Sequence, residues 1–150
     1  MAGLRKFLKI NNRKGKIMNI VLWILQLLLA AQFLQHGLIM LFPPVEYIEV
    51  MNATLGVGLR YFIGIVELLA VVGLILPGLL RIYVWLLPLT LAGLMILTAS
   101  ATVHHSFRGE TSSAIYTLVL FIVITFVAYM RWKVKPILSR NKAINSEKMV

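Results

Sequence analysis

Four long apolar segments dominate this chain, and short polar breaks separate them. They cover residues 17–42, 61–80, 82–103 and 114–130. Each is close to the ~20 residues that an α-helix needs to cross ~30 Å of hydrocarbon. We therefore predict an all-α integral membrane protein, in which a four-helix bundle over residues 17–132 lies between two basic tails, residues 1–16 and 133–150. The first segment runs well past residue 31, which favours a spanning helix over a cleaved signal peptide.

The connection between the first two segments carries its own helical pattern. Proline disfavours helical geometry in the residue before it, so Pro43-Pro44 ends the first helix, and Pro44 can open another. Apolar residues then recur at spacings of three and four, which predicts a short amphipathic helix lying on the outer membrane surface. Its apolar positions are Val45, Ile48, Met51 and Leu55.

Glycine and proline mark further expected features. We predict a break before the first span near Asn11-Asn12 and Gly15, a tight turn over residues 77–81, and a bend at Pro88 inside the third span. Small residues in the second and third spans predict close helix packing. These residues are Gly64, Ala70, Gly73, Ala92 and Gly93.

The distribution of charged residues predicts the orientation of the bundle in the membrane. The chain carries a net charge of +10, with six basic residues before the first span and six after the last. Four spans put both tails on one side, together with Arg81 in the second connection. The positive-inside rule then predicts cytoplasmic termini and a multi-pass protein of the cytoplasmic (inner) membrane. Because the basic residues gather at membrane-facing tails, we expect them to touch anionic lipids and expect no nucleic-acid partner.

Polar groups inside the spans are the candidates for chemistry. A charge within a helical span costs a few kcal/mol, so Glu67 in the second span needs a reason to be there. The outer parts of the first and third spans reach the same depth, about 10 Å below the surface at 1.5 Å per residue. This shared depth predicts a polar cluster in the outer half of the bundle. Its candidate ligand-binding residues are Glu67, His36, Arg60, Gln32, Thr98, Thr102 and His105.

Each of these residues also has a purely structural interpretation. Thr98 and Thr102 can bond to the carbonyl four residues back, and Gln32 can bridge helices. Glu67 can be a structural carboxylate, held by His36 or by Arg60 of a neighbouring subunit. We predict no metal site, because the adjacent His104 and His105 point about 100° apart on a helix. The sequence contains no cysteine, so no thiolate chemistry is expected.

Two stretches carry a family resemblance. Residues 60–69, Arg-Tyr-Phe-Ile-Gly-Ile-Val-Glu-Leu-Leu, and the later segment His105-Ser-Phe-Arg108-Gly109-Glu110 resemble signatures of the DoxX-like family of small bacterial membrane proteins. The resemblance extends over residues 22–132. It implies a four-helix membrane bundle associated with quinone-coupled or other redox complexes and with oxidative-stress assemblies.

These observations lead to a ranked set of functional hypotheses. The first is a membrane subunit that binds a quinone or similar lipophilic ligand, or that supports a partner oxidoreductase; Glu67 and His36 would contact the polar head and Arg60 would balance the charge. The second is a ligand-free assembly protein in which the polar cluster fixes helix packing. The third, a small transporter, would require oligomers of this chain. No complete catalytic set is visible, so whether the chain is an enzyme stays open.

Overall fold

The computed structural model describes the backbone of residues 2–139 and the side chains of residues 13–139. Over this range the chain is entirely helical apart from its connections. The helices are α1 (Ala2–Leu41), α2 (Val45–Leu55), α3 (Val57–Leu80), α4 (Leu86–Phe107) and α5 (Thr111–Tyr129), followed by one π-helical segment, η1 (Met130–Val134). Four of these helices are long and apolar enough to cross a membrane, which confirms the predicted all-α bundle of four spans.

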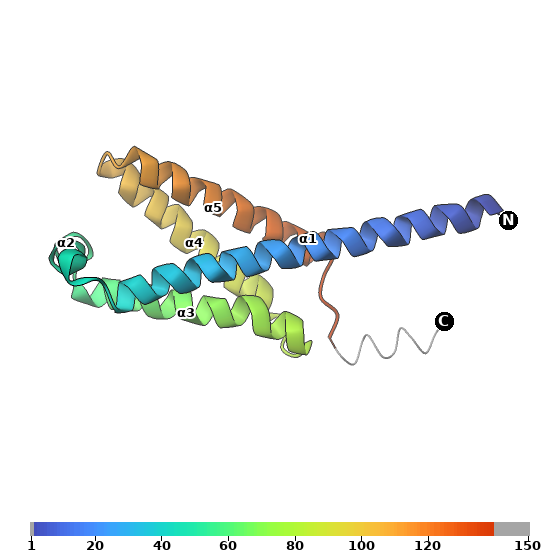
Figure 1. Cartoon of the computed structure of the whole chain (residues 1–150), viewed down its shortest axis with the longest axis horizontal. Coiled ribbons are helices and arrows are strands. Elements are labelled where there is room, and N and C mark those ends of the chain that lie inside the picture. Colours follow the sequence, from blue (N-terminus) through green and yellow to red (C-terminus); the bar gives the residue numbers. More distant parts are fainter. Residues whose placement is uncertain (1, 140–150) are drawn as a thin grey trace.

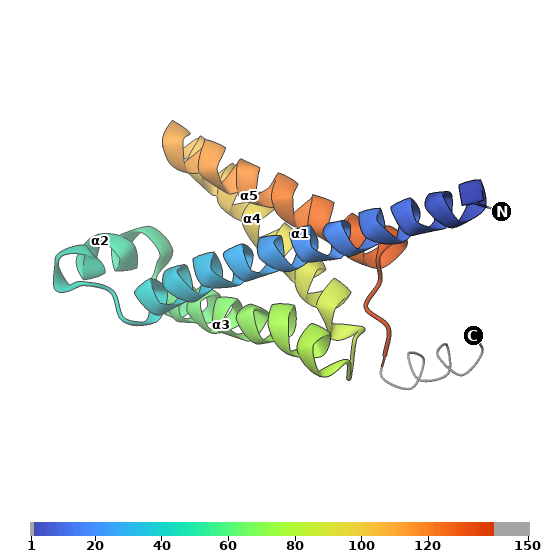
Figure 2. The same ribbon diagram turned by 45° about the vertical axis from the view of Figure 1, so that its right-hand side comes forward.

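The bundle consists of two antiparallel pairs that cross each other. The helix α1 packs along α3, and α4 packs along α5 (Figure 1). The turned view shows the same pairing, with α2 at one end of the molecule and the N-terminal part of α1 at the other (Figure 2). We call these the α2 end and the basic end. The basic end is defined by Lys16, Arg81, Arg131 and Lys135.

Apolar side chains fill the centre where the two pairs cross. Leu74, Leu91, Ile124 and Val127 have no exposed surface, and each comes from α3, α4 or α5. Large apolar side chains also cover the outside of all four spans, as a lipid-facing surface requires.

Glycines determine how closely the helices approach. A Cβ on Gly64 would lie 2.8 Å from Leu41 Cγ, so this position lets α3 lie directly against α1. Gly73 plays the same role where α3 meets Thr90 of α4. Gly93 instead faces open space and is exposed, so the prediction of a packing role for this residue is wrong.

Several predicted helix limits also differ from the structure. The expected break near Gly15 is absent, because one glycine costs a helix only about 1 kcal/mol and α1 continues through it. Pro88 does not bend α4. That helix begins at Leu86, so Pro88 lies in its first turn. A backbone N–H has no partner within the helix at this position, so proline costs no hydrogen bond there. The turn before α4 lies after Pro77 rather than around it, with Arg81 in the left-handed conformation at φ 55°.

Candidate functional site

The pairing of α1 with α3 brings His36 and Glu67 into direct contact. The Nδ1 nitrogen of His36 lies 2.7 Å from Oε2 and 2.9 Å from Oε1 of Glu67, so one ring nitrogen is within hydrogen-bonding distance of both carboxyl oxygens. Glu67 is 3% exposed, whereas the His36 side chain is 43% exposed. The close approach depends on Gly37, because a Cβ there would lie 3.2 Å from Glu67 Cβ. The sequence-based alternative that His36 holds Glu67 therefore matches the observed contact.

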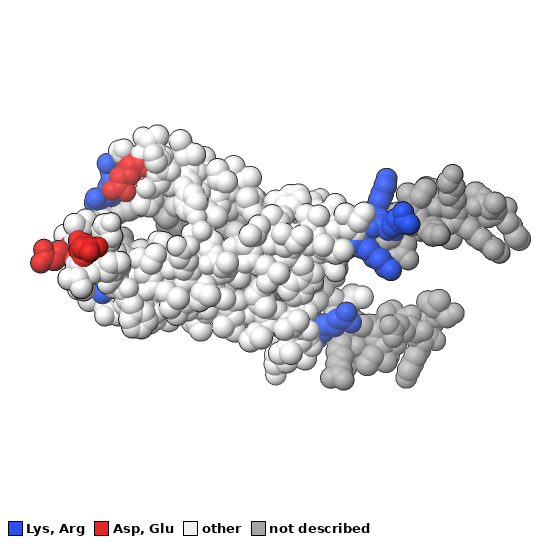
Figure 3. Space-filling view, viewed as in Figure 1, with Lys and Arg blue, Asp and Glu red and all other residues white. Residues whose placement is uncertain are grey.

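A cavity opens beside this pair at the α2 end, where the two helix pairs diverge (Figure 3). Its volume is about 430 Å³, within the range of sites that hold small molecules. All four spans contribute to it. The polar lining residues are Gln32, His36, Glu67, Thr98, His105, Ser112, Ser113, Tyr116 and Thr117, and the apolar ones are Phe33, Leu97, Ala101 and Leu120.

The structure thus brings together five of the seven residues predicted to bind a ligand. Gln32, His36, Glu67, Thr98 and His105 all line the cavity. The hydroxyl groups of Thr98 and of Thr102 each donate to the carbonyl oxygen four residues earlier, at 2.8 Å, as in their structural interpretation. Thr98 keeps an acceptor site on its oxygen, because only its proton is used.

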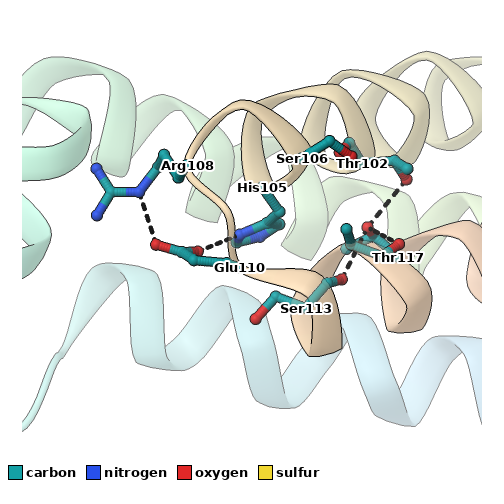
Figure 4. A network of polar contacts seen from close by, with 8 residues as sticks. Thr102, His105, Ser106, Arg108, Glu110, Ser113 and Thr117 are labelled. Carbon is teal, nitrogen blue, oxygen red and sulfur yellow. Dashed lines mark hydrogen bonds and ion pairs between the residues drawn. The ribbon is translucent and has the colours of Figure 1, made fainter.

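Thr102 does not line the cavity but contacts a residue that does. Its hydroxyl oxygen is 2.9 Å from that of Thr117, which lines the cavity from α5 (Figure 4). Thr117 in turn lies within hydrogen-bonding distance of the Ser113 carbonyl oxygen, at 3.0 Å. Thr102 therefore positions a lining residue.

Arg60 lies in a different place from the rest of the predicted set. It is 2% exposed, its Nε donates to Asn52 Oδ1 at 2.9 Å, and its Nη1 donates to the carbonyl oxygen of Met40. Its guanidinium also stacks over the Tyr61 ring, 4.4 Å from the centroid. These contacts tie α2 to the end of α1 and to α3. Arg60 does not line the cavity and does not contact Glu67.

An ionic cluster lies beside the cavity, at the connection between α4 and α5. Glu110 accepts from His105 Nδ1 and from Arg108 Nε, each at 2.6 Å (Figure 4). Gly109 has φ 72°, a conformation that favours glycine. Hydrogen bonds from Arg108 and then from His105 hold the pKa of the Glu110 carboxyl below its ordinary value. The spacing of these residues in the sequence therefore builds a tight ionic turn that fixes His105 at the cavity.

One buried polar network was missed by the sequence analysis, which counted Arg131 among the six basic residues after the last span and predicted a polar cluster in the outer half of the bundle alone. Arg131 is 4% exposed, and its Nε and Nη1 donate to Gln26 and Asn19 at 2.6 and 2.8 Å. Gln26 also donates to the Leu74 carbonyl oxygen at 2.9 Å. The signal lay in the first segment, where Asn19 and Gln26 are seven residues apart and so share one helix face.

Four apolar helices around a cavity with several polar side chains in its wall define a small multi-pass membrane protein. Among such proteins, the chain belongs to the DoxX-like family, whose family model matches residues 24–127. The match confirms the resemblance in the sequence, and every residue lining the cavity lies inside it. No curated protein matches the chain. No solved structure matches it either.

Proposed function

We propose that the cavity at the α2 end binds a quinone or a similar lipophilic molecule with a carbonyl-bearing head. The observation that carries this proposal is the His36–Glu67 pair in the wall of a cavity inside a membrane bundle. Ionisable side chains are rare within spans and commonly mark functional sites. Membership of the DoxX-like family supports a membrane role without naming the ligand.

The chemistry of the lining suits such a head group. Glu67 occupies Nδ1 of His36, so Nε2 is the ring nitrogen left for a ligand. With the ring proton on Nδ1, Nε2 accepts from a hydroxyl. With the ring proton on Nε2, Nδ1 accepts from a protonated Glu67 and Nε2 donates to a carbonyl oxygen, so the two states match the reduced and oxidised forms of a quinone. Gln32 offers a further donor and acceptor one helical turn away. Glu67 orients His36 and does not need to touch the ligand.

The walls suit the apolar part of the same molecule. Phe33, Leu97 and Leu120 line the cavity beside the polar groups, and Tyr116 offers an aromatic ring. Arg60 lies away from the cavity in this single chain, so we assign it to holding α2 and not to balancing the charge of Glu67. In the cell, such a protein would act as a small membrane subunit beside an oxidoreductase. In a bacterium, both would belong to the inner membrane.

The experiment is a binding titration with a soluble short-chain quinone on purified protein in neutral detergent. We expect Gln32→Ala and His36→Ala to weaken binding about tenfold, the effect of losing one ligand hydrogen bond worth ~1.4 kcal/mol. Gln35→Ala is the matched control, because Gln35 lies on the same helix, is exposed and does not line the cavity. Equal affinity in all four proteins would rule out this site.

The second candidate function is a ligand-free assembly protein. The observation that favours it is that His36 and Glu67 already satisfy each other across α1 and α3. In that case Glu67→Gln would lower thermal stability or expression without the loss of any bound molecule. Stability and ligand content measured on the same sample separate the two functions.

A further inference from the structure

A second cavity lies at the basic end, far along the bundle from the first. Its volume is about 640 Å³, and it is bounded by residues 15–23 of α1, the end of α3 and the segment that follows α5. Four of its lining residues are cationic: Lys16, Arg81, Arg131 and Lys135. The others are Gly15, Asn19, Trp23, Gly78, Leu79, Pro136, Ile137 and Leu138.

Arg131 is the most deeply buried of these cations, and no carboxylate among the described residues pairs with it. Its hydrogen-bond partners are the neutral side chains of Asn19 and Gln26, and its guanidinium lies 5.6 Å from the centroid of the Trp23 ring. Its Nη2 is buried without a hydrogen-bond partner among the described residues. Burying a charge is costly unless an opposite charge or further hydrogen bonds compensate it.

The local backbone is built to hold Arg131 in this position. The π-helical segment η1 closes with a bond from Lys135 N to the carbonyl oxygen of Met130, five residues back, at 2.7 Å. Such π turns often occur at functional sites. Lys135 then reaches over α1, since a Cβ on Gly15 would lie 2.9 Å from its Nζ. Two cations that follow α5, Arg131 and Lys135, thus contact residues 15–26 of α1.

No carboxylate in the described part of the chain reaches this cavity. The acidic residues between residues 13 and 139 are four glutamates. Glu46 and Glu49 belong to α2, Glu67 to the half of α3 nearer α2, and Glu110 to the connection between α4 and α5. The space-filling view shows red atoms only at the α2 end, next to some blue atoms, and no red atoms at the basic end, where the coloured atoms are all blue (Figure 3). The cavity therefore has four positive charges and no internal counter-ion among residues 13–139.

We propose that this cavity binds a phosphate group, and that the phosphodiester head of an anionic membrane phospholipid is its main source. Guanidinium and ammonium groups together are typical of phosphate recognition, and basic pockets between spans at the membrane surface bind lipid head groups. The apolar lining favours a lipid over a free anion. Trp23, Leu79 and Ile137 give acyl chains a surface beside the charges.

The test is native mass spectrometry of delipidated protein titrated with dioleoyl phosphatidylglycerol, with dioleoyl phosphatidylcholine as the neutral-head control. We expect one tightly bound phosphatidylglycerol and about tenfold preference over phosphatidylcholine, since each nearby basic residue contributes to anionic-lipid binding. No preference between the two lipids would overturn the proposal.

A matched pair of variants tests the location. Lys16→Gln/Lys135→Gln removes two cavity cations, and Lys14→Gln/Lys133→Gln removes two cations from the same segments that do not line the cavity. The first variant should lose the preference and the second should keep it. Equal loss of the lipid preference in both variants would mean that it comes from the overall positive charge of the basic end and not from the cavity. That result would contradict the proposal. These lysine side chains are not buried, so the test does not depend on a variant of Arg131.

Two further arms distinguish the occupants. Displacement of phosphatidylglycerol by millimolar inorganic phosphate would support a phosphate site that also accepts free anions, and retention would support a site specific for the lipid. Glu147 is the fifth acidic residue of the sequence and lies outside the described residues. A Glu147→Gln variant that binds the lipid much more tightly than the wild type would show that the chain supplies its own counter-ion. That outcome would contradict the proposal.

Discussion

At the scale of single residues, the contact between His36 and Glu67 is the central feature. Glu67 is almost fully buried in a span, and its carboxylate oxygens are both within 2.9 Å of one histidine nitrogen. In a membrane, where water cannot replace a lost partner, such a contact stabilises the pair of helices and also orients the ring.

We predict that the two residues are energetically coupled. In a double-mutant cycle with His36→Ala and Glu67→Gln, the coupling should be about 1 kcal/mol, near the upper range measured for interhelical hydrogen bonds in membranes. The measurement is the free energy of unfolding in mixed detergent for the four proteins. Additive effects of the two substitutions would show that the contact contributes no stability.

Glu110 gives a pH-dependent prediction outside the spans. Its pKa in the folded protein is lowered from the ordinary 4.5 by Arg108 and His105, so its stabilising contribution is present above that pH. The contribution is lost as the pH falls through the lowered value. Thermal unfolding midpoints of wild type and Glu110→Gln should therefore differ at pH 7 and converge in acid. A difference that persists at the lowest pH at which the protein stays folded would contradict the assignment.

At the scale of helices, glycine contacts set the distance between α1 and α3, and with it the geometry of the candidate site. Gly64 of α3 lies against Met40 and Leu41, and Gly37 of α1 lies against Glu67. These contacts explain why a histidine and a glutamate from separate helices can meet at hydrogen-bonding distance.

We predict that Gly64→Val lowers the free energy of unfolding by about 1–3 kcal/mol, the usual cost of overpacking a well-packed interior. The control is Gly93→Val, which carries the same chemical change to a helix position with nothing within 4 Å. Unfolding in mixed detergent measures both. If the two variants lose stability equally, the β-branched side chain and not the helix contact explains the effect.

The sequence predicted the helices better than it predicted their limits. Apolar length identified all four spans, and the proline pair with the following periodicity identified α2, because these signals are local. Pro88 was misplaced because an apolar run does not reveal where a helix starts within it. Arg131 was missed because its burial depends on contacts with Asn19 and Gln26, more than 100 residues earlier in the chain. The cavity follows from how two helix pairs diverge, which no local pattern encodes.

At the scale of the whole molecule, charge separates the two ends. Glu46 and Glu49 belong to α2, and Glu110 belongs to the connection between α4 and α5. Figure 3 shows red atoms only at the α2 end, next to some blue atoms, and only blue atoms among the coloured ones at the basic end. By the positive-inside rule we propose that the basic end faces the cytoplasm and that the cavity with His36 and Glu67 opens toward the opposite side.

The absence of cysteine from the sequence makes this orientation directly testable. Single cysteines at the exposed positions Glu49 and Arg81 report the two ends. In right-side-out spheroplasts, a membrane-impermeant maleimide should label the Glu49→Cys protein at once and the Arg81→Cys protein only after permeabilisation. The reverse pattern would show that the bundle is inserted the other way round.

The central claim is that the polar cavity at the α2 end holds a lipophilic ligand. The most direct measurement is mass spectrometry of the small lipophilic molecules that co-purify with the intact protein, comparing wild type with a folded Glu67→Gln variant. The proposed function predicts a quinone or related molecule in the wild type and its loss in the variant. An empty wild type, or the same molecule at the same occupancy in both proteins, would contradict the claim and favour a structural role for the polar cluster.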